Sequence, residues 1–241
     1  MDYLSCADTA EKLGITIRRV QQMCKQGELP GAVKDGRTWM IPVNIVSEDL
    51  NAKKKPLPIG VSDFKAATAG YYYVDKTLLI RDFLDTKPMV SLFTRPRRFG
   101  KTLNMNMLRV FFEKTAEDTS VYFMDKQIWQ CGDFYTRHQG QYPVIFLTFK
   151  DVKCLSWEET FQKIRILISL EFMRHSELEN SSVLTTYEKE QYHRLASGSA
   201  TEVDCQMGLQ LLSMLLHKHH GKECIIIIDE YDTPIQQGHN C

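Results

Sequence analysis

A chain of 241 residues is long enough for one large domain or two modest ones. Apolar residues make up 43% of it and charged residues 25%, which are ordinary values for a folded, soluble protein. The 30 basic and 30 acidic residues cancel, so the overall charge gives no argument for binding to nucleic acid or to a membrane. Any basic surface must be local.

The seven cysteines are scattered and include no Cys-x-x-Cys pair. This spacing suits neither a disulfide framework nor a zinc site, so we expect reduced thiols in a cytosol. No apolar run approaches the roughly 18 residues that span a bilayer, and the N-terminus has no signal pattern. The chain is therefore predicted to be cytoplasmic, with no membrane partner.

Residues 3–43 contain two predicted helices and a hairpin. In "SCADTAEKLG", Ser5 is the expected N-cap and Gly14 the stop, and the residues expected on the buried face are Ala7, Ala10 and Leu13. In "TIRRVQQMCKQG", Thr16 and Gly27 take the same roles, and the inward residues are Ile17, Val20, Met23 and Cys24. Two short helices joined by a glycine-containing turn predict a helix-turn-helix.

The next segment, "AVKDGRTWMIP", predicts a hairpin at Asp35-Gly36, because the two central turn residues need positive φ. Two helices followed by a hairpin resemble the small winged DNA-binding domains of the excisionase and MerR-like group. In that resemblance the second helix enters the major groove, and the residues that would face DNA are Arg18, Arg19, Gln21, Gln22 and Lys25. On the wing, Lys34 and Arg37 would reach phosphates or the minor groove.

A second interpretation of these side chains is the solvated face of a small helical domain that contacts proteins. A monomer with so few cations would bind DNA weakly, so DNA binding implies dimerisation or a second contact. The stretch "NAKKKPLPIGVSD" combines three lysines with two prolines and predicts an exposed linker. We expect a winged helix-turn-helix domain over residues 1–45, a linker over 46–58 and a second domain over 59–241.

The segment "PMVSLFTRPRRFGKTLNMNML" has the order of a phosphate-binding loop. "PMVSLFT" is a short apolar run that ends at a turn, as a buried parallel strand does. Leu103, Met107 and Phe111 then recur at helical spacing. The P-loop pattern G-x-x-x-x-G-K-[ST] ends here in Gly-Lys-Thr, but Arg95 stands where the pattern begins with glycine.

The chemistry expected of this loop follows from its place at the start of a helix, where free N–H groups and the helix dipole attract an anion. Gly100 would let the backbone approach the phosphates, and Lys101 would place its ammonium group between the β- and γ-phosphates. Thr102 would offer its hydroxyl to Mg²⁺. The alternative is a basic surface segment that contains Gly-Lys-Thr by accident.

A second element, "ECIIIIDEYDTPI", favours the phosphate site. Its four isoleucines predict a strand buried on both faces, and Asp229 and Glu230 follow where ligands bind in open α/β sheets. In P-loop ATPases this is the Walker B position: Asp229 would hold magnesium through water, and Glu230 would orient the attacking water as general base. A solvated carboxylate pair at a strand end is the competing interpretation.

Several long stretches in order resemble the predicted AAA-like ATPase family that is abundant in anaerobic bacteria: "GVSDFKAATAGYYYVDKTLLIRDFLD", "VSLFTRPRRFGKTLNMNMLRVFFE", "YPVIFLTFKD" and "IIIIDEYDTPI". The family's loop opens with arginine, so the resemblance implies that Arg95 belongs to the nucleotide site. It implies the same of the loop residues Pro96, Arg97, Arg98, Phe99, Gly100, Lys101 and Thr102, together with Asp229. Arg97 and Arg98 would reach phosphates or pair with acidic residues, and Asp75 and Lys76 lie where such ATPases often place adenine-side contacts.

The resemblance also implies elements after Walker B that are missing from residues 1–241, including a strand between the Walker A and Walker B strands. We therefore expect an incomplete P-loop sheet, from a truncated product or an incomplete reading frame. The expected fold is α/β, a parallel sheet flanked by helices and preceded by the winged domain.

The leading functional hypothesis is an ATPase that uses ATP and Mg²⁺, with Lys101 and Glu230 as its catalytic residues and DNA or a partner assembly as the coupled process. One alternative is a DNA-binding regulator in which the nucleotide is only a structural ligand. Another is an interaction adaptor whose ATP site is a switch and whose assembly is a homo-oligomer.

Overall fold

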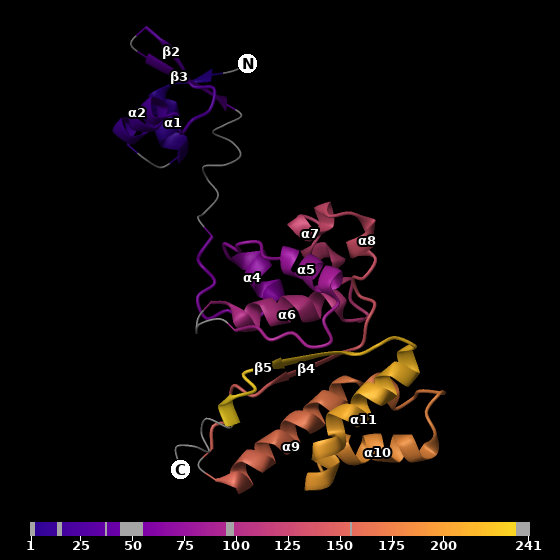
Figure 1. Cartoon of the computed structure of the whole chain (residues 1–241). Helices are drawn as coiled ribbons and strands as arrows, with labels where there is room; N and C mark the ends of the chain where they lie inside the picture. The colour runs from indigo at the N-terminus through magenta and orange to yellow at the C-terminus, as the bar shows by residue number, and fades with distance from the viewer. Residues whose placement is uncertain are drawn as a thin grey trace. The chain divides into compact units, whose positions relative to one another are not determined.

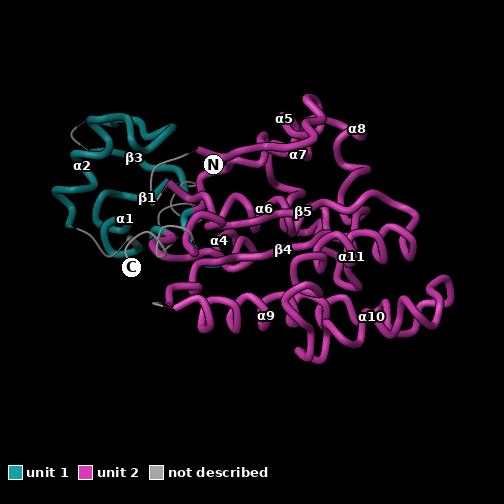
Figure 2. The backbone as a smooth tube through the Cα atoms, turned by 60° about the horizontal axis from the view of Figure 1, so that its bottom comes forward, with its two compact units in different colours: residues 1–57, 70–72 teal, residues 58–69, 73–241 magenta. Residues whose placement is uncertain are grey.

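The computed structural model describes residues 3–13, 16–36, 38–43, 55–94, 99–154 and 156–234 (Figure 1). The chain divides into two compact units, drawn in teal and magenta in Figure 2. Unit 1 comprises residues 1–57 and 70–72, and unit 2 comprises residues 58–69 and 73–241. Each unit has a buried hydrophobic cluster of its own.

Unit 1 contains two helices and a three-stranded antiparallel sheet of order β1-β3-β2. Its elements are β1 (Tyr3–Leu4), α1 (Cys6–Leu13), α2 (Ile17–Gln26), β2 (Val33–Asp35) and β3 (Thr38–Pro42). The predicted caps are confirmed, because the Ser5 hydroxyl accepts the Asp8 N–H at 3.2 Å and the Thr16 hydroxyl accepts the Arg19 N–H at 3.3 Å. Gly27 ends α2 with φ 72°, a left-handed conformation that suits glycine.

The predicted hairpin is also confirmed, but Asp35 is not a central turn residue with positive φ: it ends β2 and pairs with Thr38, and Gly36, with φ 58°, follows it in the turn. Val20, Met23 and Cys24 of α2 are buried as predicted, together with Ala10 of α1. The predictions for Ala7 and Ile17 are wrong, since both are exposed. In α1 the neighbouring Cys6 takes the inward place, and in α2 the first residue, Ile17, is exposed while Val20, about one turn further on, is buried. Gly14 and the Leu13 side chain lie outside the described residues.

Unit 2 is built around two parallel strands, β4 (Val144–Thr148) and β5 (Ile225–Asp229), paired so that Ile145 lies opposite Ile226 and Thr148 opposite Asp229. Parallel strands need a long crossover, and three helices between β4 and β5 supply it. Figure 1 shows the sheet between two helical layers, α4 to α6 on one face and α9 to α11 on the other.

The helices of unit 2 vary widely in length. They are α4 (Phe64–Gly70), α5 (Leu78–Thr86), α6 (Lys101–Phe112), α7 (Gln127–Gln130), α8 (Asp133–Thr136), α9 (Trp157–Arg174), α10 (Thr186–Ala196) and α11 (Glu202–His220), with 3₁₀ turns η1 (Thr119–Tyr122) and η2 (Ser176–Leu178). Capping boxes begin α10 at Thr185 and α11 at Thr201, which satisfies N–H groups that a helix start leaves unpaired.

Two hydrophobic clusters hold the layers to the sheet. On the α6 face, Phe111 and Phe112 pack with Phe64, Phe123 and Ile227. On the other face, side chains of β4 meet those of α9, α10 and α11, among them Ile145, Leu147, Phe172, Leu212 and Leu216. The described part of the protein is therefore mixed α/β, with a small parallel sheet and helices on both faces.

The prediction of a buried strand over residues 88–94 is wrong. These residues form no ladder with any described segment, and Met89, Val90 and Leu92 are 101%, 87% and 65% exposed. A strand depends on backbone partners on its flanks, and the described residues supply none here. The prediction that β5 is buried on both faces is also only partly right, because Ile226 is 45% exposed.

The outer edge of β4, which faces away from β5, is closed by side chains from the last turn of α9. Glu171 accepts the Phe146 N–H at 2.7 Å, and Arg174 and His175 both bond to the Val144 carbonyl. Arg174 also pairs with Glu171 at 2.6 Å and with Glu113 at the end of α6. Both carboxylates are buried, so this network satisfies charges as well as backbone groups.

None of the helices in the described ranges combines the length and the apolar character that crossing a bilayer requires.

Candidate functional site

The start of α6 carries the end of the predicted phosphate loop. Gly100 is its N-cap residue, with φ 73°, a left-handed conformation that glycine adopts without steric cost. Lys101 and Thr102 occupy the first two positions of the helix. A helix start leaves its first N–H groups without intrahelical acceptors and presents the positive end of the dipole. This part of the loop therefore has a backbone suited to an anion.

Thr102 and Asp229 are brought together although 127 residues separate them. The Thr102 hydroxyl donates to Asp229 Oδ2 at 2.8 Å, and Asp229 is only 1% exposed. Among the described residues, no lysine, arginine or histidine pairs with this buried carboxylate. A carboxylate in a dry site without a cation is costly, so the position is suited to a positively charged ligand.

Glu230 follows directly and turns the chain away from the sheet. Its φ of 52° is unusual for a residue with a side chain. The Thr233 N–H donates to the Glu230 carbonyl at 3.1 Å, and the Thr233 hydroxyl lies 3.5 Å from Glu230 Oε2. Backbone of this kind often occurs at functional sites, where the surrounding structure holds it in place.

The other predicted loop residues are only partly described. Arg95, Pro96, Arg97 and Arg98 lie outside the described residues, so their part in the site stays a prediction. Phe99 is described and exposed. Within the described ranges, no group of three or more His, Cys, Asp or Glu side chains gathers as a metal site. At the start of α6, the described oxygen groups suited to a metal ion are therefore the hydroxyl of Thr102 and the carboxylate of Asp229.

Asp75 lies just before α5 and connects this part of the chain to the start of α7 by hydrogen bonds. One carboxylate oxygen of Asp75 accepts the Thr77 N–H, and the other accepts the Gln127 N–H, both at 2.8 Å. The hydroxyl of Thr77, which is fully buried, accepts the Ile128 N–H at 3.1 Å. The protein's own backbone therefore engages both oxygens of Asp75, the residue expected on the adenine side.

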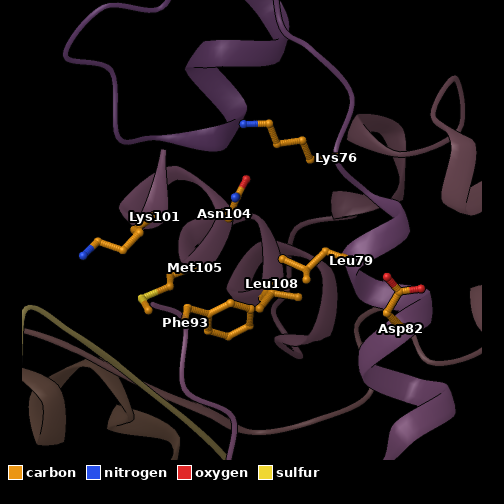
Figure 3. Close-up of a pocket in the computed structure, with 8 residues that line it drawn as sticks. All are labelled: Lys76, Leu79, Asp82, Phe93, Lys101, Asn104, Met105 and Leu108. Carbon is orange, nitrogen blue, oxygen red and sulfur yellow. The ribbon is translucent and has the colours of Figure 1, made fainter. Parts of the chain in front are cut away.

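A cavity of about 210 Å³ opens beside the start of α6 (Figure 3). The residues that line it are Lys76, Leu79, Asp82, Phe93, Lys101, Asn104, Met105 and Leu108. Sequence reasoning missed Asn104 and Met105 as site residues. The signal that could have found them is helical spacing, because positions 101, 104, 105 and 108 share one face of α6.

In unit 1, the residues predicted to face DNA lie on the surface of the helix-turn-helix. Arg18, Gln22 and Lys25 are exposed on α2. Arg19 is also exposed but forms an ion pair with Glu28 at 3.3 Å. Gln21 and Lys34 are exposed as well, and Arg37 lies outside the described residues.

The chain belongs to the predicted AAA-ATPase family, whose model matches residues 58–240. A helix-turn-helix domain model matches residues 3–48. The two matches indicate an ATPase-type domain that follows a domain of a DNA-binding type. The family resemblance inferred from the sequence motifs is thereby confirmed, and so is the helix-turn-helix.

One curated relative is similar to this chain, the "Uncharacterized protein in vnfD 5'region" of Azotobacter chroococcum mcd 1. The two are 27% identical over 184 residues, which is 76% of this chain and 30% of that protein. The chain thus spans less than a third of the relative's length. No solved structure matches the chain.

Proposed function

We propose that unit 2 binds ATP with Mg²⁺ at the start of α6 and hydrolyses it. The observation that carries the proposal is the 2.8 Å hydrogen bond between Thr102 and Asp229. The P-loop threonine and the Walker B aspartate are the protein groups that hold magnesium in P-loop ATPases. Here the two come from separate elements and meet in a buried place, where no lysine, arginine or histidine of the described ranges forms an ion pair with Asp229. A P-loop type of parallel sheet is part of the same proposal.

The groups present fit magnesium. Mg²⁺ prefers hard oxygen ligands and is held by one or two carboxylates together with substrate phosphates. Thr102 and Asp229 would hold the ion, which would neutralise charge on the β- and γ-phosphate oxygens when bound. Lys101, at the first position of α6, would contact the same oxygens, and the free N–H groups of the helix start would bind the phosphate chain.

Glu230 is proposed as the residue that orients the attacking water. It comes directly after Asp229, and its positive φ turns its side chain out of the strand direction. A carboxylate at this position accepts a proton of the water and aligns the oxygen for in-line attack on the γ-phosphate. Arg95, Pro96, Arg97, Arg98 and Phe99 would complete the wall of the nucleotide site.

Unit 1 is proposed to bind DNA through a winged helix-turn-helix in residues 1–45, joined to the ATPase domain (59–241) by a linker. The support is the exposed face of α2, where Arg18, Gln22 and Lys25 lie together at helical spacing. Arg19 would have to exchange its contact with Glu28 for a phosphate. Arg37 would add a contact from the hairpin. One small domain implies weak binding that falls steeply with salt.

Two other functions remain open to test. A regulator that keeps its nucleotide as a structural ligand would bind a specific DNA sequence without ATP. An adaptor that uses ATP as a switch would form homo-oligomers with ATP and would not bind DNA. Gel-shift and size-exclusion measurements, each with and without ATP, separate the three functions.

The direct test is titration of fluorescent ATP with Mg²⁺ against the wild-type chain and Lys101→Ala. Loss of one charged contact to phosphate is expected to weaken binding at least about tenfold. Lys163→Ala, on an exposed part of α9, is the matched control and should bind as the wild type does. Equal affinity of all three proteins, or no binding by the wild type, would contradict the proposal.

A further inference from the structure

Lys76 occupies an outward position in a segment whose neighbours are held by the core. Tyr73, Asp75 and Thr77 turn inward, whereas Val74 and Lys76 are exposed, an alternation that extended backbone produces. Tyr73 donates to Met107 Sδ of α6 at 3.4 Å, and Asp75 and Thr77 accept N–H groups from the start of α7. The residues before and after Lys76 are thereby fixed by hydrogen bonds, and the Lys76 side chain faces outward.

The ammonium group of Lys76 stands next to the start of α6. A Cβ atom added at Gly100 would lie 3.7 Å from Lys76 Nζ. Lys76 and Lys101 both line the cavity, from two different segments, and Figure 3 shows the ammonium group of Lys76 on the side of Asn104, whereas the Lys101 side chain extends the other way. Lys76 therefore brings a cation to the place where the helix start already favours an anion, and Lys101 begins that helix.

No described acidic side chain neutralises either lysine by an ion pair. Among the described residues that line the cavity, the one carboxylate is Asp82, and it bonds to Arg81 at 2.9 Å. Like charges that share a site repel unless an anion lies between them. The charge pattern thus fits a ligand with several negative charges.

The rest of the cavity is apolar. Leu79, Phe93, Met105 and Leu108 form its floor and walls (Figure 3). Sites for small molecules combine such apolar walls with a few polar groups that fix orientation. A ligand that is anionic at one end and flat and apolar at the other matches this lining, and a nucleoside triphosphate has that form.

We propose that Lys76 is a second lysine of the nucleotide site: its ammonium group contacts the phosphate chain, and the cavity below it receives the base. This rests on the proposed function and adds to it a cation from outside the P-loop. It also assigns a role to the hydrogen bonds of Asp75 and Thr77, which hold residues 73–77 so that the Lys76 side chain lies beside the start of α6.

The test compares wild type, Lys76→Ala, Lys76→Arg and the control Lys163→Ala for binding of ATP, ADP and adenosine by calorimetry. Because charge-assisted contacts to phosphate are the strong ones, Lys76→Ala is expected to weaken ATP binding about tenfold or more. The loss should be smaller for ADP and absent for adenosine, and Lys76→Arg should keep most of the affinity. Thermal unfolding of each variant checks that the turn stays folded.

The outcomes separate the two proposals. If Lys101→Ala loses ATP binding while Lys76→Ala binds as the wild type does, the inference about Lys76 is wrong and the phosphate site stands. If Lys76→Ala weakens ATP and adenosine equally, Lys76 does not act on the phosphates and the inference is again wrong. A wild-type chain that binds none of the three ligands would overturn both proposals.

Discussion

The two edges of the small parallel sheet differ in how their backbone groups are satisfied. On the outer edge of β4, Glu171 accepts the N–H of Phe146, and Arg174 and His175 donate to the carbonyl of Val144. On the outer edge of β5, the ladder directs the N–H and C=O groups of Ile226 and Ile228 away from β4, and no described residue bonds to them. One edge is closed by charged side chains, and the other has no partner among the described residues.

The difference teaches where this sheet can be extended. Unpaired N–H and C=O groups on an edge strand are a template for another strand, whereas an edge whose groups already have partners is not. Extension is therefore possible beside β5, the strand that ends in Asp229, and blocked beside β4. The candidate site lies at the end of the strand whose outer edge has no described partner, so its geometry depends on how that edge is covered.

The largest expected effect comes from opening the closed edge. Arg174→Ala should lower the free energy of unfolding by about 3 kcal/mol, because it removes the one arginine that pairs with both buried carboxylates and leaves Glu113 with Arg109 and Glu171 with His175. Arg194→Ala removes an arginine from an exposed pair with Asp204 and should cost less than about 1 kcal/mol. Urea unfolding followed by circular dichroism measures both. Similar losses in the two variants would mean that the network does not stabilise the edge.

The second prediction concerns the free energy of unfolding and compares two isoleucines that are paired between β4 and β5. Ile145 of β4 is fully buried, whereas Ile226 of β5 is 45% exposed. Ile145→Ala should lower the free energy of unfolding by about 2 to 5 kcal/mol, since it leaves a cavity in the core. Ile226→Ala should cost less than about 1.5 kcal/mol. Equal costs would show that the outer side of β5 is covered in solution.

The third expected effect, which is spread over several pH units, is the dependence of stability on pH. Burial alone would raise the pKa of Glu171, but hydrogen bonds from Arg174 and His175 outweigh it and lower the pKa from 4.5 to about 2. A carboxylate with a lowered pKa stabilises the fold above its unfolded value and loses that contribution as the pH falls. Stability should therefore decline from about pH 5 towards pH 2.

The variant Glu171→Gln tests the cause of this decline. It should be less stable than the wild type at pH 7, but its stability should fall less steeply in acid, because the titrating group is gone. Glu190→Gln, on an exposed part of α10, is the control and should keep the wild-type slope. Thermal melting at a series of pH values measures the slopes, and an unchanged slope for Glu171→Gln would contradict the assignment.

Local signals allowed much of the fold to be predicted. The caps at Ser5, Thr16 and Gly27, the turn at Gly36 and the helix after Gly100 all depend on the conformations of a few neighbouring residues. Burial was predicted less well. Ala7 and Ile17 are exposed because the residues of a helix that become buried depend on where its packing partner covers it, which local spacing alone does not identify.

The sequence by itself determined the candidate residues Gly100, Lys101, Thr102, Asp229 and Glu230, because phosphate and magnesium chemistry requires those residue types in that order. Only the tertiary structure decided that Thr102 bonds to Asp229, that Asp75 holds the turn and that Lys76 faces the start of α6. It also decided that residues 88–94 form no strand. The physical reason is that a local pattern specifies what a segment can become, whereas contacts between distant segments depend on which partners the folded chain brings together.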